Sequence, residues 1–229
     1  MLPFGPPEPT SLLFAGDTHN NDLPWKQVVL PAAHKHQVGG IVQLGDFGCW
    51  PLTGGGRGYL AWLSSEVDDS GLWIVLADGN REDHRALLQL AGRADGFVEV
   101  TARIRWAPRR LRCTCPGVRL RALGGVHPID RQRRKLDSGR WGWFKKKRIT
   151  PEQARRASAG GPTDVQITHD DPLGAQLRVR LEGVPKHSPG TQQSVRRLQV
   201  VADATKPKLL GRPLQVVHVT CTPFTGPHL

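Results

Sequence analysis

Four short apolar runs along the chain each end in a polar segment. The runs at 11–15, 40–44, 72–76 and 164–167 are followed by GDTHNN, GDFG, ADGNRED and THDDP, respectively. Apolar runs of this length, bounded by turn residues, are typical of buried strands. The sequence therefore predicts four strands whose carboxyl ends all carry polar side chains.

The segments between and after these runs have helical patterns. They predict helices near 24–36, 58–68, 82–91 and 192–204, and Pro31 is expected to kink or end the first of them. Strands that alternate with helices in this way predict an α/β domain with a largely parallel sheet. A run at 214–219 alternates apolar and polar residues and predicts one more strand.

The chain length favours one domain. Its 229 residues suit a single core, and we expect a Pro-rich extension at 1–10 followed by one domain at 11–229. The four cysteines form no CxxC pair, which predicts reduced thiols rather than a zinc site. No apolar run approaches the ~20 residues of a transmembrane helix, so the sequence predicts a cytoplasmic protein that does not contact membranes.

The positive charge is concentrated in one segment. The chain has 32 Lys and Arg against 20 Asp and Glu, a net charge of +12. Residues 101–150 alone contain sixteen of the basic residues and only two Asp. Such a segment is either a binding surface for nucleic acid or another polyanion, or a solvated insertion. The composition leaves both interpretations open.

The polar residues after the strands suggest a metal site. Asp17 and His19 follow the first run, Asp46 the second, Asn80 the third and His169 the fourth. Ligands of open α/β sheets collect at the carboxyl ends of strands, and carboxylate, amide and imidazole ligands suit Mn, Fe or Zn. The alternative is that the acids are helix caps or turn residues, with the asparagine in a turn and the second histidine in a loop.

In order and spacing, these motifs resemble the calcineurin-like metallophosphoesterases. That family is recognised by Asp-x-His, Gly-Asp, Gly-Asn-His-Glu/Asp, a lone His and Gly-His-x-His, and here GDTHNN, VQLGDFG, DGNRED and ITHDDP stand in that order. The segment ALGGVHPIDRQRR is similar to one in bacterial and phage-type members. The resemblance spans about residues 12–210 and implies a four-layer α/β/β/α sandwich of two mixed sheets, incomplete at its C-terminal edge.

The resemblance also implies a role for each residue. Asp17 and His19 would bind the first of two divalent metal ions, Asp46 would bridge both, and Asn80 and His169 would bind the second. A bridging carboxylate holds two cations about 3.5–4 Å apart, so that they share a hydroxide and clamp the phosphoryl oxygens. The nucleophile would then be metal-bound hydroxide, with Mn, Fe or Zn as the metals.

Two departures from the family pattern concern catalysis. Arg81 stands where the family has a histidine thought to protonate the leaving group; arginine can contact phosphate but stays protonated. Where Gly-His-x-His is expected, the sequence reads GRPLQVVHVTCTPFTGPHL. Residues of the expected type therefore stand at five of the seven ligand positions of the family. Catalytic activity is expected to be impaired. Two alternatives stay open. His218 or His228 could take the place of the missing histidines, or a change of reading frame before the tail could account for their absence.

The remaining acids and histidines are expected to be peripheral. They are predicted to be surface groups or neighbours of the ligands (Asp170, Asp171, His84 and His127) or solvent-facing helix residues (His34 and His36).

The sequence thus predicts a phosphoesterase that hydrolyses phosphate monoesters or diesters. The basic segment at 101–150 suggests a nucleotide or nucleic acid as substrate. The competing hypothesis is a catalytically inactive homologue that binds nucleic acid or another polyanion through this segment. A purely structural oligomerisation module would leave the polar strand ends unexplained. The oligomeric state, the metal and the natural substrate stay open.

Overall fold

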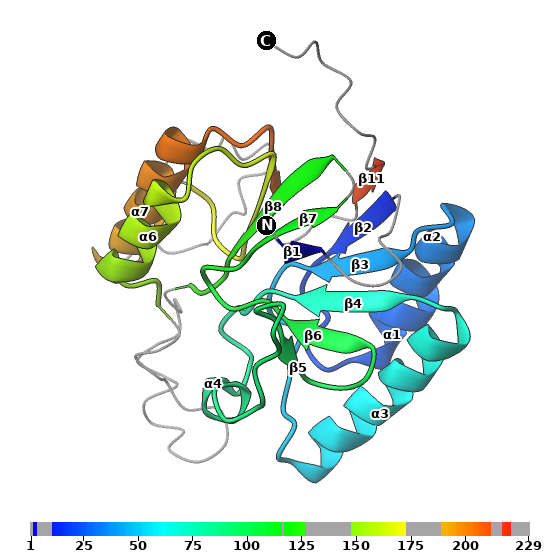
Figure 1. Cartoon of the computed structure of the whole chain (residues 1–229). Coiled ribbons are helices and arrows are strands. Elements are labelled where there is room, and N and C mark those ends of the chain that lie inside the picture. The colour runs from blue at the N-terminus through cyan, green and yellow to red at the C-terminus, as the bar shows by residue number, and fades with distance from the viewer. Residues whose placement is uncertain are drawn as a thin grey trace, which may run out of the picture.

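A computed structural model of the chain contains two packed β-sheets flanked by helices (Figure 1). The residues that it describes are 2–3, 11–115, 117–126, 148–172, 189–211 and 217–220. None of the helices in these ranges is both long and apolar enough to cross a bilayer.

The first sheet has six strands within the described residues, in the order β11-β2-β3-β4-β6-β5. In that order they are Val217–Thr220, Ser11–Ala15, Gly40–Gln43, Trp73–Leu76, Ile104–Trp106 and Val98–Glu99. The four central strands run parallel, and β11 and β5 are antiparallel to their neighbours. The carboxyl ends of β2, β3 and β4 therefore lie side by side at one edge of the sheet.

The second sheet has five described strands in the order β1-β7-β8-β9-β10. They are Leu2–Pro3, Arg112–Cys115, Val118–Leu123, Val165–Thr168 and Leu209–Gly211. Strands β7 and β8 form an antiparallel pair, and the other pairs are parallel. Part of the predicted N-terminal extension thus adds a short strand to this sheet.

Helices cover the outer faces of both sheets. They are α1 (Asp22–Pro24), the π-helix η1 (Trp25–Val29), α2 (Leu30–Lys35), α3 (Gly54–Asp69), α4 (His84–Leu87), α6 (Pro151–Ala159) and α7 (Pro189–Thr205). Figure 1 shows α1 to α3 beside β3 and β4, and α6 and α7 together beside β8. Thr150 begins α6 with a capping box, and Thr53 caps α3.

Successive side chains of β2 point to opposite faces of the first sheet, and each face packs against a different layer. Leu12 and Phe14 belong to an apolar cluster shared with residues of the second sheet such as Ile167. Leu13 lies in a cluster with Trp25 and other side chains from the first helical layer. A third cluster joins residues of α6 and α7 to the second sheet. The packing follows the order of an α/β/β/α sandwich, the fold that the resemblance in motif order implied.

The predicted helix at 82–91 is mostly wrong. Only His84–Leu87 is α-helical. The side chain of Asp83 sets its start by accepting from the backbone N–H groups of Arg85 and Ala86. After Leu87 the chain continues with tighter bonds between residues three apart, including Gln89 to Ala86. Pro31 does not end the first helix, although the helical geometry changes from π to α directly before it. It occupies the first turn of α2, directly after the π-helix, where a missing N–H is tolerated.

The described arginines of the basic segment are largely structural. Arg121 is 1% exposed and donates to the carbonyl oxygens of Ala157 and Gly161, which ties β8 to the end of α6. Burial is the main reason why the pKa of Arg121 is lowered to about 10, and the positive charge of nearby Arg112 lowers it further. The runs RQRRK and FKKK lie outside the described residues, as does most of the tail that bears on the predicted incomplete edge.

Asp164 joins three strands of the second sheet, and replacing it should lower stability above pH 4. Its carboxylate accepts from the backbone and side chain of Arg119, and Lys208 lies 3.7 Å away. The hydrogen bond from Arg119 lowers the pKa of Asp164 from 3.8 to about 2. The carboxylate therefore stabilises the fold above pH 3.8, and this contribution disappears as the pH falls through about 2.

Urea unfolding at several pH values measures this effect. Asp164→Asn should lower the free energy of unfolding by about 1 kcal/mol near neutral pH, since Arg119 is partly exposed and solvent screens the pair. The deficit should shrink as wild-type Asp164 becomes protonated. The exposed Asp69→Asn should stay within about 0.5 kcal/mol of wild type at neutral pH. A deficit for Asp164→Asn that is independent of pH would contradict the electrostatic explanation.

Candidate metal centre

The predicted site residues converge around Asp46. Asp17 and His19 follow β2, Asp46 follows β3, and Asn80 follows β4, three neighbouring parallel strands. His169 follows β9 in the other sheet and approaches from across the sandwich. These five residues are called the Asp46 cluster below.

Three members of the cluster contact the carboxylate of Asp46 directly. His19 Nε2 lies 3.3 Å from Oδ2, and His169 Nε2 lies 3.2 Å from Oδ1. The side-chain amide of Asn80 donates to Oδ2 at 3.4 Å. Asp46 is buried, whereas the His19 side chain is 45% exposed, so the cluster opens to solvent on the side of His19.

The loop after β4 is fastened to the same carboxylate. The backbone N–H groups of Asn80 and Arg81 donate to Asp46 Oδ1 at 2.6 and 2.9 Å. The Arg81 guanidinium Nε lies 3.9 Å from Oδ2, and its side chain is 38% exposed. Arg81 thus stands at the mouth of the cluster, where it can reach an anion.

Asp17 supplies a carboxylate oxygen that no described residue satisfies with a hydrogen bond. Its Oδ1 is buried and accepts no hydrogen bond from any described residue, and it lies 4.0 Å from His169 Nδ1. Burial raises the pKa of Asp17, although His169 opposes this shift. A buried carboxylate oxygen without a donor costs free energy unless a cation or solvent satisfies it.

His169 is oriented as a metal ligand would be. Its Nδ1 lies 2.9 Å from the backbone carbonyl of Leu44, so Nδ1–H can donate there while Nε2 faces Asp46. Metal-binding histidines are commonly fixed in this way through the other ring nitrogen. Burial would lower the pKa of His169, but the hydrogen bond to Asp46 outweighs it and raises the pKa to about 9.

The electrostatics favour a negative Asp46. Burial alone would raise its pKa, yet hydrogen bonds from His169 and His19 hold the pKa well below its ordinary value. The two histidines therefore occupy positions in which a cation would also be stabilised by this carboxylate. Together with Asp17, this arrangement places one ligand atom each from Asp17, Asp46 and His169 within 4.8 Å of one another.

The donor set fits a divalent metal. It combines carboxylate oxygens, imidazole nitrogens and an amide, which suits Mn, Fe or Zn better than a thiolate-preferring ion. The unsatisfied oxygen of Asp17 and the carbonyl-anchored ring of His169 are the two structural observations that support this fit.

Backbone strain is concentrated at the cluster. Six non-glycine residues in the described ranges have positive φ, and four of them are Asp17, His19, Asn20 and Asp46, with φ between 50° and 58°. This region costs energy for residues with a Cβ, although Asp, Asn and His tolerate it best. Strained non-glycine residues cluster at functional sites, which is consistent with a site here.

Two glycines allow the loops to approach this closely. Gly45 has φ +95°, and a Cβ there would overlap the side chain of His169. A Cβ on Gly79 would overlap Asp46 and lie 2.8 Å from His169 Cδ2. The glycines before the polar residues thus make room for the site.

Gly79→Ala should disturb the site more than the fold. Gly79 has no positive φ, so the backbone accepts alanine, but the new methyl group must displace Asp46 or its backbone. We expect a loss of about 1–3 kcal/mol in the free energy of unfolding and a fall of at least about 10-fold in Mn²⁺ affinity.

Gly58→Ala is the matched control for this variant. A Cβ at Gly58 meets nothing within 4 Å, and the residue lies within α3. That substitution should leave Mn²⁺ binding unchanged and raise stability by up to about 1 kcal/mol. Equal Mn²⁺ affinity in Gly79→Ala and Gly58→Ala would show that close packing at Gly79 does not shape a metal site.

Sequence reasoning did not single out Glu82, which holds the site together. Glu82 is completely buried and accepts from the backbone N–H groups of Phe47, Gly48 and Gly79, at 2.7, 3.3 and 2.6 Å. It thereby ties the loop after β3 to the loop after β4. Its position as the acid of the Gly-Asn-His-Glu/Asp motif was the signal that could have revealed it.

The other histidines and acids lie away from the centre of the cluster. His34 and His36 are exposed, as predicted, and Asp170 and Asp171 are partly buried beside His169. His84 is buried, so it is not a surface group, and its ring pairs with Asp78 rather than with a member of the Asp46 cluster. His218 lies on β11 opposite Leu13, in the middle of β2 rather than at its carboxyl end. His127 and His228 lie outside the described residues.

A second buried polar group underlies the loop after β4. Asp78 is completely buried and is bound by Arg109 Nε at 2.7 Å, His84 Nε2 at 2.9 Å and Trp106 Nε1 at 3.3 Å. Burial would raise the pKa of Asp78, but Arg109 and His84 keep it well below its ordinary value. Sequence reasoning also passed over this group.

No protein-family model matches the chain, and no curated protein matches it.

Proposed function

We propose that the chain is a metal-dependent phosphoesterase that hydrolyses phosphate monoesters or diesters with two divalent cations. The observation that carries the proposal is the convergence of five potential metal ligands from four strand ends, with four of them gathered around the fifth, the buried carboxylate of Asp46. Turn and capping roles alone do not require residues from two different sheets to meet at one point.

The residues would divide between the two cations. Asp17 and His19 would hold one, Asn80 and His169 the other, and Asp46 would contact both. Bound divalent cations supply Lewis-acid stabilisation of phosphoryl oxygens and activate water for attack. The protein contributes the fixed orientation of the ligands, through the Leu44 carbonyl behind His169 and the backbone N–H groups that donate to Asp46.

Arg81 would act on the substrate directly. Its partly exposed guanidinium beside Asp46 can donate to phosphoryl oxygens and stabilise the charge that develops on them. It cannot protonate a leaving group at neutral pH. Substrates whose leaving groups are already acidic, such as nitrophenols, should therefore react much faster than alkyl esters.

Arg81→His should narrow that difference. A histidine at this position could donate a proton, and general acid catalysis contributes about 10²–10⁴-fold where it operates. We expect kcat for an alkyl phosphate ester to rise by at least about 10-fold, while kcat for a nitrophenyl ester changes little or falls. Parallel kinetics on both esters measure this, with Arg85→His, at the exposed residue of α4, as the matched control. A fall of equal size for both esters would show that Arg81 contributes only phosphate binding.

Hydrolysis of chromogenic esters tests the function itself. Purified protein with Mn²⁺ should release nitrophenol from a phosphodiester or a phosphomonoester, and a chelator should abolish the release. Restoring Mn²⁺ should restore it. Absence of turnover on both substrates by a folded, monodisperse sample with Mn²⁺ would contradict the proposal.

The alternative function, an inactive homologue that binds a polyanion through residues 101–150, draws less support from the described residues. Arg105 and Arg121 are buried, and Arg119 is paired with Asp164. These side chains are committed to the fold. Binding of nucleic acid that weakens steeply with salt, in a protein that shows no metal-dependent turnover, would favour this alternative.

A further inference from the structure

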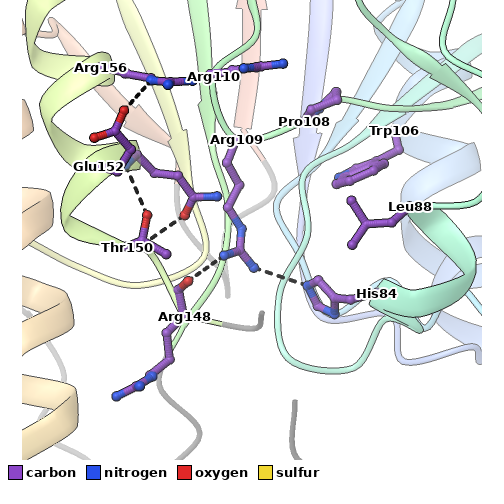
Figure 2. A pocket seen from close by; sticks show the side chains of 11 residues that line it. His84, Leu88, Trp106, Pro108, Arg109, Arg110, Arg148, Thr150, Glu152 and Arg156 are labelled. Atoms are coloured by element: carbon purple, nitrogen blue, oxygen red, sulfur yellow. Dashed lines mark hydrogen bonds and ion pairs between the residues drawn. The ribbon is translucent and has the colours of Figure 1, made fainter. Parts of the chain in front are cut away.

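A cavity of about 460 Å³ lies between the two sides of the sandwich, next to the loop after β4. Figure 2 shows His84, Leu88 and Trp106 on one side, Arg148, Thr150 and Glu152 on the other, and Arg109 between them. Its size is within the range of small-molecule sites, about 300–1,000 Å³. We call it the arginine pocket, after Arg109, Arg110, Arg148 and Arg156, which line it.

The charge of the lining favours an anion. Four arginines and a single acid, Glu152, line the pocket; Arg109 is paired with the fully buried Asp78 and Arg156 with Glu152, which leaves an excess of positive charge. Arg109 is held rigidly by Asp78 and by the carbonyl oxygen of Arg148, 2.7 Å from Nη1. Arg110 is exposed, and its guanidinium has no acidic partner among the described residues. Planar guanidinium groups are well suited to bind phosphate through paired hydrogen bonds.

The opposite wall is apolar. Trp106, Pro108 and Leu88 line it; Leu88 is 52% exposed and Trp106 only 6%, so Leu88 is the large side chain that this wall presents to a ligand. Such a wall offers contact area to a planar ring, which bare phosphate would not use. An apolar wall facing several arginines matches a ligand that carries both a ring and phosphate groups.

We propose that the arginine pocket binds a nucleoside phosphate, with its phosphates on the arginines and its base against the Trp106 wall. This goes beyond the proposed phosphoesterase function, because binding there requires neither the metal nor turnover. The loop at 78–84 separates the two sites. It presents Asn80 and Arg81 to Asp46 and turns His84 toward the pocket.

Titration calorimetry with adenosine diphosphate, in the presence of a chelator, tests the proposal. Arg156 and Arg155 both pair with the same acid, Glu152, but only Arg156 lines the pocket. Arg156→Ala should weaken binding by about 10-fold, and Arg155→Ala should leave it unchanged. Equal effects of the two variants, or no binding by folded wild-type protein, would overturn the proposal.

Two further variants show which part of the ligand is recognised and at which of the two sites it binds. Leu88→Ser should weaken adenosine diphosphate binding by several-fold and leave pyrophosphate binding unchanged, since only the nucleoside uses the apolar wall. If Leu88→Ser affects neither ligand, the pocket takes simple anions and the nucleoside assignment is wrong. Asp46→Asn should retain binding; if that variant abolishes it, the ligand occupies the Asp46 cluster instead.

Discussion

Asp46→Asn should reduce metal-dependent phosphoester hydrolysis by roughly 10³-fold or more. The asparagine has the same shape, and its oxygen can still accept the N–H groups of Asn80 and Arg81. It removes the negative charge that would contact both cations. Losing the bridging ligand should cost several kcal/mol of transition-state stabilisation, which corresponds to a rate loss of this size.

The loss should occur with little change in fold. Circular dichroism of Asp46→Asn at the assay temperature should resemble wild type, although thermal unfolding should begin at a lower temperature, because the buried carboxylate no longer pairs with His169. The exposed Asp69→Asn, at the end of α3, is the matched control and should keep full activity. Activity within about threefold of wild type for Asp46→Asn would refute the bridging role assigned to Asp46.

Arg109→Met should lower the free energy of unfolding by about 3–5 kcal/mol. Arg109 is 6% exposed and contacts Asp78 through both Nε and Nη2, and Asp78 is completely buried. Removing the guanidinium leaves a buried carboxylate with an uncompensated charge, which is strongly destabilising. For a chain of this size, the midpoint of thermal unfolding should fall by roughly 6–20 °C.

A double-mutant cycle separates this charge from packing. Asp78→Asn in the Arg109→Met background should recover part of the lost stability, because the unpaired charge is then absent. Arg155→Met is the control for an arginine paired at the surface, since its side chain is 74% exposed, and it should cost less than about 1 kcal/mol. If Arg109→Met costs no more than Arg155→Met, the buried pair does not stabilise the fold.

The centre of the site could be predicted from the sequence because strand ends are easy to recognise. Apolar runs that stop at Gly-Asp or Gly-Asn identify β2, β3 and β4, and parallel neighbours bring their ends together. Their convergence with His169 was harder to foresee from the pattern alone, because β9 belongs to the other sheet. The resemblance in motif order supplied that connection.

The second sheet was predicted poorly because its strands contain buried charge. Strand β8 reads VRLRAL, and its Arg121 is almost fully buried against carbonyl oxygens of α6 and the turn after it. A pattern of this kind resembles a basic surface. Gln166 on β9 is also fully buried and pairs with Thr205. Tertiary hydrogen bonds that satisfy such groups leave no trace in hydropathy.

Helix α6 was missed for a related reason. It begins at a clear capping box, Thr150 with Gln153, but follows directly on the run FKKKR and is itself rich in arginine. Its buried face consists of small residues, Ala154 and Ala157, which give a weak apolar signal. Glu82 and Asp78 were overlooked because a buried acid and an exposed turn acid look alike in sequence.

Titration of Mn²⁺ into metal-free protein is the most direct test of the account, because it asks whether the Asp46 cluster holds a metal at all. Wild type should show saturable binding of at least one equivalent. Asp46→Asn should bind at least about 10-fold more weakly, and Asp69→Asn should bind like wild type. Folded wild-type protein that binds no Mn²⁺, Fe²⁺ or Zn²⁺, or that binds them as tightly after Asp46→Asn, would contradict the central claim.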